Sequence, residues 1–317
     1  MTFALRCLSV SLAFFLIFYT LLSVFVRRGW RRVQRLASHL SARRMADLLF
    51  LMRILPAVAA LVICCAFVVP SFLLLEPRVS AEPVGEIPLT LGLCCMALFV
   101  IGAYDATRAS VRTSQAVQNW LKDARELPAQ HAVPVFQIRP TVPSLTLTGW
   151  CSPRVLLSSS AAAVLCASEL NAALKHEFAH ARRKDNLKKL LFRLVIFPGM
   201  SQLEAAWGHA GEMAADDEAV SCAREALDLA SALIKLSRLA PVQSSLALTT
   251  ALLQEIPSSV NARIERLVAW DPMRASQTTR SIAWYLRPAV AATCVALFLT
   301  YGMALRETHL LTEWLVR

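Results

Sequence analysis

Charged residues are scarce in this chain, where Asp, Glu, Lys and Arg together make up 17% of the 317 residues. Hydrophobic residues reach 56%, and the mean hydropathy is +0.50. Soluble globular domains carry roughly a quarter of their residues as charged side chains. The composition therefore excludes an ordinary soluble protein over the whole length, and it predicts that a lipid bilayer is the solvent for much of the chain.

Glycine is also rare, with 9 residues, and the sequence contains no nucleotide-binding glycine pattern and no internal repeat. These absences argue against the common nucleotide-binding folds and against repeat architectures. None of the 9 cysteines forms a C-x-x-C pair. Six of them lie in long apolar runs and three in a region predicted below to be cytoplasmic, so we interpret them as packing residues rather than disulfide partners.

Four stretches of the sequence contain no charged residue and are long enough to cross a hydrocarbon core of about 30 Å as a helix. They are residues 7–26, 54–75, 87–104 and 288–305. The first is too long for a cleaved signal peptide and ends in Arg27 and Arg28 rather than in a small-residue cleavage site. We therefore predict four transmembrane helices, three of them in residues 1–104 and one in residues 288–317.

Arginines predict the orientation of these spans, because cytoplasmic loops of membrane proteins are enriched in Lys and Arg. Eight arginines lie between Arg27 and Arg53, whereas the loop from Glu76 to Glu86 contains one arginine and three glutamates. The loop 27–53 and the segment 105–287 are therefore expected on the cytoplasmic side of the membrane, with both termini outside. The net charge of +11 fits contact with an anionic inner leaflet and does not require a nucleic acid partner.

The segment 105–287 has the composition of a soluble domain. Short runs at 132–138, 144–148 and 155–157 predict strands, and periodic patterns predict helices over 168–185, 203–224, 226–239, 244–253 and 258–270. An apolar basic helix over 187–197 is expected to lie on the membrane or to pack on the spans. The fold class is thus a mainly helical polytopic membrane protein with an inserted cytoplasmic α+β domain.

An H-E-x-x-H motif from His176 to His180 lies within the helical pattern 168–185. Residues four apart lie on one helix face, so His176 and His180 can bind one Zn²⁺ ion while Glu177 acts as general base on a water molecule. Such a motif alone occurs by chance in on the order of 1 in 100 chains of this length. Two ordinary histidines on a surface helix are the alternative interpretation.

A catalytic zinc needs a third protein ligand, and Glu212 on a later predicted helix supplies a carboxylate. Asp216, one turn further on, is expected to accept the free ring N–H of His176 and so fix its tautomer. An exposed acidic face formed by Glu212, Asp216, Asp217 and Glu218 is the alternative. His209 lies near the same helix face as a candidate oxyanion stabiliser, although a partly exposed polar histidine is the favoured interpretation.

These motifs resemble the BlaR/MecR-type membrane metallopeptidases, which are named for β-lactam sensor-transducers. The shared features are three spans before the motif and one after it, Glu169-Leu170 ahead of the motif, and the elements 149–157, 182–186 and 212–216. The resemblance implies a gluzincin zinc protease domain with a small sheet. It also implies that an edge strand, either 144–148 or 155–157, binds the substrate in extended form.

Known members of that family carry an external penicillin-binding domain after the last span, whereas this sequence ends at Arg317. We therefore expect proteolysis without direct β-lactam sensing, and a signal that enters through a membrane or external sensor partner. The leading function is regulated or self-processing proteolysis of a cytoplasmic protein, such as a DNA-binding repressor. A membrane-protein quality-control gluzincin and a non-catalytic membrane receptor are the alternatives; the intact ligands and Glu177 argue against the latter.

Overall fold

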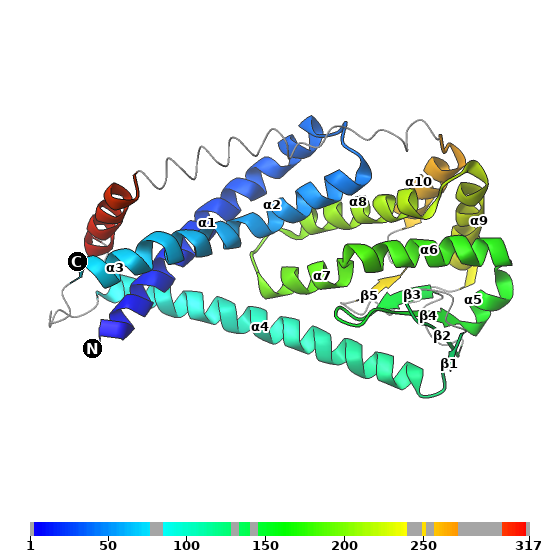
Figure 1. The fold of residues 1–317 in the computed structure, drawn as a ribbon, viewed down its shortest axis with the longest axis horizontal. Coiled ribbons are helices and arrows are strands. Elements are labelled where there is room, and N and C mark those ends of the chain that lie inside the picture. Colours follow the sequence, from blue (N-terminus) through cyan, green and yellow to red (C-terminus); the bar gives the residue numbers. More distant parts are fainter. Residues whose placement is uncertain are drawn as a thin grey trace. The chain divides into compact units, whose positions relative to one another are not determined.

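The computed structural model describes residues 3–76, 85–127, 133–139, 145–239, 249–251, 257–271 and 300–314. Helices dominate these residues, and five short strands form one mixed sheet (Figure 1). The chain divides into two compact units. The first comprises Met1–Gly29, Met52–Ile101 and Thr278–Arg317, and the second comprises Trp30–Leu51 and Gly102–Gln277.

Three helical stretches of the described residues are long and apolar enough to cross a bilayer. They are α1 (Phe3–Leu36), α2 (Ala42–Ile63) continued through a π-helical turn (Cys64–Val68) into α3 (Val69–Leu75), and α4 (Glu86–Leu121). Three of the four predicted spans lie within them. The fourth predicted span, 288–305, falls mostly outside the described residues. Residues 300–314, which are described, are helical.

A proline explains one contact within the first unit. Pro70 near the start of α3 has no backbone N–H, so the carbonyl of Ala66, four residues earlier, lacks its normal helical partner. The hydroxyl of Tyr301 donates to this carbonyl oxygen at 2.7 Å. A polar backbone group in an apolar helix is thereby satisfied by another helix of the same unit.

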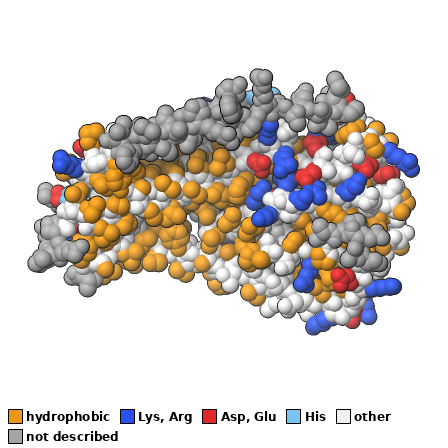
Figure 2. Space-filling model, in the orientation of Figure 1, with side chains coloured by type: hydrophobic (Ala, Val, Ile, Leu, Met, Phe, Trp, Pro, Cys, Tyr) orange, Lys and Arg blue, Asp and Glu red, His pale blue; other side chains and the backbone are white. Residues whose placement is uncertain are grey.

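Hydrophobic side chains cover the surface of the long helices in Figure 2, whereas Lys, Arg, Asp and Glu gather over the second unit. Many of the large hydrophobic residues of these helices are exposed, among them Phe25, Val62, Leu74, Leu93 and Val100. Exposed leucine, valine and phenylalanine at such density would be unfavourable in water. The surface therefore agrees with helices whose outer face meets lipid.

The sheet of the second unit has the strand order β1-β2-β4-β3-β5. Its strands are β1 (Arg125–Glu126), β2 (Val135–Ile138), β3 (Leu145–Thr148), β4 (Arg154–Ser158) and β5 (Thr249–Ala251). Only β2 and β4 pair in parallel. The three predicted strands are therefore present in the described residues, and the sheet gains a strand from far along the chain.

The prediction that 144–148 or 155–157 forms a free edge is wrong. Strand β3 lies between β4 and β5, and β4 lies between β2 and β3. The prediction failed because β5 lies in the run 244–253, which we expected to be helical. Its two adjacent β-branched threonines, Thr249 and Thr250, favour the extended conformation that pairs with β3.

Six further helices of the second unit lie in the described residues. They are α5 (Ser159–Val164), α6 (Ala167–Arg183), α7 (Asp185–Leu194), α8 (Ser201–Ala219), α9 (Ala223–Leu239) and α10 (Pro257–Val268). Alternating residues of the sheet face α6 and α9, where Leu145, Leu147, Val155 and Leu157 form one core. The residues between them face the other way, where Ile138 and Leu156 pack with Trp120 and Leu121 of α4.

Helix α7 directly follows the metal-motif helix and is in contact with α2. The Lys188 amine lies 3.6 Å from the Asp47 carboxylate and 5.3 Å from the centre of the Phe50 ring. The rings of Phe50 and Phe192 are 5.7 Å apart. The apolar basic helix expected over 187–197 thus packs against the residues of α2 that belong to the second unit.

Helix α4 contacts the other end of α7. Arg193 forms an ion pair with Asp105 at 2.9 Å. Gly102 lies so close to the carbonyl of Leu194 that a Cβ atom there would collide with its oxygen. A glycine is therefore required at position 102 for the two backbones to approach each other.

We predict that Gly102→Ala lowers the thermal stability of the detergent-purified protein, because the added methyl group would push α7 away from α4. Overpacking of this kind costs about 1–3 kcal/mol. Gly208→Ala on α8 is the matched control, since a Cβ there meets no atom within 4 Å. Alanine should leave the melting temperature unchanged or raise it at position 208. Equal melting temperatures for both variants would refute the close packing.

Candidate metal centre

Three potential metal ligands converge between α6 and α8. The Nε2 atoms of His176 and His180, one helical turn apart on α6, lie 3.1 Å from each other. Each of these nitrogens is 3.4 Å from an oxygen of Glu212 on α8. The three ligand atoms lie within 4.8 Å of one another, and all three residues are buried. Two imidazoles and one carboxylate at this spacing match the donor set of catalytic zinc sites.

Glu177 lies beside these ligands and is fully buried. Its Oε2 atom accepts a hydrogen bond from the backbone N–H of Leu147 on β3 at 3.0 Å. Its Oε1 atom has no hydrogen-bond partner among the described residues. A buried carboxylate oxygen without a partner is unfavourable unless a further group binds there. The geometry therefore leaves one oxygen available for a water molecule at the metal position.

Each histidine has a carboxylate at its second ring nitrogen. Asp216 Oδ1 lies 2.9 Å from His176 Nδ1, and Asp185 Oδ2 lies 2.7 Å from His180 Nδ1. Carboxylates in these positions hold the proton on Nδ1 and leave Nε2 free to bind a metal. The Asp216 contact has the geometry expected from the sequence, whereas the pairing of Asp185 with His180 was not anticipated.

A local backbone feature explains how Asp185 reaches His180. Helix α6 ends at Arg183, and the next residue, Lys184, has a φ of 56°, the only positive φ of a non-glycine residue among the described residues. This left-handed residue turns the chain, so that Asp185 begins α7 and faces back toward the metal helix. The spacing of five residues from His180 was visible in the sequence, but the turn that makes it useful was not.

Arg263 of α10 connects the two carboxylates of α8. Its side chain is fully buried, and it donates to both oxygens of Asp216 at 2.8 and 2.7 Å. Its third nitrogen lies 2.9 Å from Glu212. A guanidinium is well suited to such fork-like pairing. Sequence reasoning missed this role, although an arginine on the same helix face as Val260 and Leu267 marks a buried charge that needs partners.

Burial of Glu212 and Asp216 rules out the exposed acidic face considered above. Their exposed fractions are 8% and 1%. The other two acidic residues of that expected face are engaged elsewhere, since Asp217 binds Arg266 and Glu218 binds Arg182. His209 is half-buried on α8, and its assignment as an oxyanion stabiliser stays a prediction.

Burial and neighbouring charges set the protonation of the centre without a metal. Burial raises the pKa of Glu177 to about 7. Burial by itself lowers the pKa of His180, but the Glu212 and Asp185 carboxylates outweigh it and raise that pKa to about 10. Arg263 and His176 hold the pKa of Asp216 below its usual value against the opposing effect of burial. The carboxylates thus favour a positive charge at the ligand position, either as protons or as a metal cation.

Strand β3 is hydrogen-bonded to α6 and α7, two of the helices that form the site. Asn186 of α7 donates to the backbone oxygens of Leu147 and Gly149 at 3.3 and 3.1 Å. The neighbouring Leu147 N–H binds Glu177 as described above, and Leu147 is opposite Thr250 in the pairing of β3 with β5. The backbone of β3 therefore fixes the position of Glu177 relative to the sheet.

The fold and this centre define a helical protein with an H-E-x-x-H metallopeptidase site. Comparison with protein families gives the same class, since the family described as BlaR1 peptidase M56 matches residues 87–267, more than half of the chain. The protein therefore belongs to this family, and the resemblance inferred from the sequence motifs is confirmed. No curated protein matches the sequence.

Two general properties follow from membership of this family. Peptidases of this family are generally metal-dependent, and the His176, His180 and Glu212 cluster is a site that can bind a metal. Together with three helices apolar enough to cross a bilayer, membership also indicates a membrane protein. The matched region begins in α4 and ends in α10, and it contains every residue of the centre described above.

We predict that Asp185→Asn weakens metal binding by the purified protein about 10- to 100-fold, because the amide stabilises the ring tautomer of His180 less well. Competition with a chromophoric zinc chelator measures the affinity. Asp217→Asn on α8 removes the same charge away from the ligands and should bind as tightly as the wild type. Unchanged affinity in Asp185→Asn would show that Asp185 does not orient His180.

Proposed function

We propose that the protein is an integral-membrane zinc endopeptidase that cleaves cytosolic or membrane-associated proteins in regulated proteolysis. The observation that carries the proposal is the convergence of His176, His180 and Glu212 next to a buried general base, Glu177, with an unpaired oxygen. A receptor that had only kept the fold would not need to bury this costly set of charges. The non-catalytic alternative is therefore disfavoured.

The proposed roles follow from the geometry. His176, His180 and Glu212 would hold the zinc ion, which supplies Lewis acidity to the reacting peptide carbonyl when bound. Glu177 takes the proton of the attacking water and returns it to the leaving amine. Asp216 and Asp185 orient the two imidazoles, and Arg263 fixes Glu212 and Asp216 relative to each other.

A protein substrate, rather than a small molecule, is supported by the strand beside the site. Strand β3 carries Leu147, whose N–H touches Glu177, and it pairs on its outer side with the three residues of β5. An extended segment is thus bound to β3 through backbone hydrogen bonds. Because β5 occupies this side of β3, a substrate segment could pair there only by displacing β5.

Regulation is supported by the contacts of α7. This helix follows the metal helix after one residue, and it packs against α2 through Lys188 and Phe192 and against α4 through Arg193. A change in the packing of those long helices would therefore shift α7, and with it Asp185 at its first turn. A DNA-binding repressor is the substrate we favour, with the signal supplied by a membrane or external partner. Quality control of membrane proteins is the alternative.

We predict that Glu177→Gln abolishes proteolysis while the protein keeps its zinc, because glutamine preserves the shape but cannot accept a proton. Loss of a positioned general base costs roughly 10²- to 10⁴-fold in rate. Comparison of cytosolic proteomes from cells expressing wild type and Glu177→Gln should show fragments that only the wild type produces. Fragments that come only from secreted proteins would refute a cytoplasmic regulatory role, and integral-membrane fragments alone would favour quality control.

Two further variants control this experiment. Glu218→Gln on α8 makes the same chemical change outside the ligand set and should leave both cleavage and metal content intact. Glu212→Ala should lose zinc as well as activity, because it removes a first ligand. Metal analysis that found full zinc in Glu212→Ala would show that another residue is the third ligand.

The orientation in the membrane gives a separate prediction. The arginines between Arg27 and Arg53 predict that this loop and the metal centre are cytoplasmic. Single tags placed near Gly85 and near Gln130 should therefore differ, with only the first accessible to an impermeant reagent added outside intact cells. Labelling of the second tag under these conditions would place the active site, and its substrates, on the external side.

A further inference from the structure

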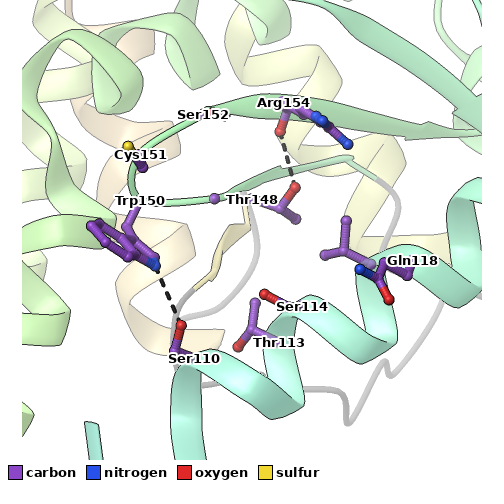
Figure 3. A pocket seen from close by; sticks show the side chains of 11 residues that line it. Ser110, Thr113, Ser114, Gln118, Thr148, Trp150, Cys151, Ser152 and Arg154 are labelled. Atoms are coloured by element: carbon purple, nitrogen blue, oxygen red, sulfur yellow. Dashed lines mark hydrogen bonds between the residues drawn. The ribbon is translucent and has the colours of Figure 1, made fainter. Parts of the chain in front are cut away.

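A cavity of about 270 Å³ lies between α4 and the turn that connects β3 to β4. It is on the face of the sheet opposite to α6, since Thr148 and Arg154 alternate with the core residues Leu147 and Val155. Its walls are Ser110, Thr113, Ser114, Val117 and Gln118 of α4 and residues of the β3–β4 turn (Figure 3). The cavity is therefore separate from the metal centre, with strand β3 between them.

The lining of this cavity is unusual for the space between a helix and a sheet. The five α4 residues recur at spacings of three and four, so they form one helix face, and four of them are polar. A helix face that packs on a sheet is normally apolar, as it is one turn further on, where Trp120 and Leu121 contact Leu156. The polar face is thus not explained by packing.

One buried hydroxyl lacks a partner. Thr113 is 5% exposed, and its Oγ1 atom has no hydrogen-bond partner among the described residues. Figure 3 shows its side chain on the side of α4 that faces the turn, beside Ser114. A buried hydroxyl without a partner destabilises the protein unless a bound group or water satisfies it. This observation indicates that the cavity is built to hold a polar ligand.

The charge of the residues that line the cavity restricts the class of ligand. Arg154 is the one charged residue among the eleven that line the cavity, and its exposed side chain places the guanidinium carbon 6.0 Å from the centre of the Phe136 ring. Gln118 and several hydroxyls add hydrogen-bond donors. A guanidinium pairs best with planar or tetrahedral oxyanions, of which phosphate is the commonest. The volume is below the usual range of drug-sized pockets, so the ligand is small.

The location on α4 agrees with a ligand at the membrane surface. Ser110 follows the apolar run 87–104 by six residues, which is roughly 9 Å along a helix. One headgroup layer is about 5–8 Å thick, so Ser110 lies at its outer boundary. Trp150 is 45% exposed at this end of the cavity, and its indole N–H donates to Ser110 at 3.3 Å. Tryptophans are enriched at headgroup level.

We propose that this cavity binds a phosphate ester of a small polyhydroxyl group, with glycerol phosphate as the simplest example. Arg154 pairs with the phosphate, while Thr113, Ser114 and Gln118 bind the hydroxyl end and satisfy the buried Thr113 oxygen. The same chemistry is offered by a free metabolite and by the headgroup of an inner-leaflet glycerolipid. The second source depends on the proposed orientation of the membrane helices, whereas neither depends on peptidase activity.

Cys151 provides a direct measurement, because it lines the cavity, is exposed and is not in a disulfide. Alkylation of full-length Glu177→Gln protein in detergent is followed by mass spectrometry with and without sn-glycerol 3-phosphate. At a concentration of about ten times Kd, the ligand should slow the reaction of Cys151 roughly ten-fold. Cys166 and Cys222, which are exposed outside the cavity, should react at unchanged rates. Glycerol is the uncharged control compound.

Substitutions test whether Arg154 and Thr113 carry the binding. Arg154→Gln should abolish the protection, whereas Arg139→Gln, which removes an exposed arginine outside the cavity, should preserve it. Thr113→Val keeps the shape of the side chain and should weaken protection without lowering the melting temperature, so it remains informative if Arg154→Gln does not fold. Protection that survives both Arg154→Gln and Thr113→Val would overturn the proposal.

The two sources are distinguished in lipid nanodiscs. If the ligand is the lipid headgroup, Cys151 should be protected in phosphatidylglycerol discs. This protection should be lost in Arg154→Gln and absent in phosphatidylcholine discs. Protection by soluble glycerol 3-phosphate in detergent, without any effect of phosphatidylglycerol, would assign a free metabolite. Equal protection by glycerol, equal shielding in both kinds of disc, or no protection by either phosphate source would refute the site.

Discussion

The metal centre depends on several carboxylates that are buried away from water. Glu177, Asp185, Glu212 and Asp216 are all at least nine-tenths buried. Their mutual repulsion would be unfavourable without Arg263, which bridges Glu212 and Asp216, and without the two imidazoles between them. A divalent cation would complete this balance of charge. Ion pairs thus join the helices that supply these residues, which are α6, α7, α8 and α10.

This arrangement links the chemistry to the membrane helices. Helix α6 ends at Arg183, and after Lys184 helix α7 begins at Asp185, whose carboxylate lies 2.7 Å from His180 Nδ1. The other end of α7 lies against Gly102 of α4. One short helix thus connects a residue beside a metal ligand with a helix that is apolar enough to span a bilayer. The proposed regulated proteolysis would use such a connection to pass a change in the long helices to the site.

The two faces of strand β3 have different surroundings. Its backbone at Leu147 binds Glu177, and its leucines pack in the core with α6. Its other face carries Thr148 toward the polar cavity against α4. A ligand in that cavity would therefore be one strand away from Glu177. The outer side of β3 is occupied by β5.

Local sequence determined the long helices and most residues of the site. Charge-free runs predicted the helices now seen in α1, α2–α3 and α4, and the spacing of His176 and His180 predicted two ligands on one helix face, because both depend only on neighbouring residues. The family resemblance likewise rested on short motifs. Glu212 was proposed from its type and from Asp216 one turn later, and the structure brings it within 3.4 Å of both histidines.

Only the tertiary structure decided the rest. The pairing of Asp185 with His180 requires the left-handed turn at Lys184, and the bridge made by Arg263 joins helices about fifty residues apart in sequence. The edge of the sheet was predicted wrongly because a strand from residues 249–251 pairs with β3 across about one hundred residues of chain. Periodicity predicts which face of an element is buried, but it contains no information on which distant segment covers that face.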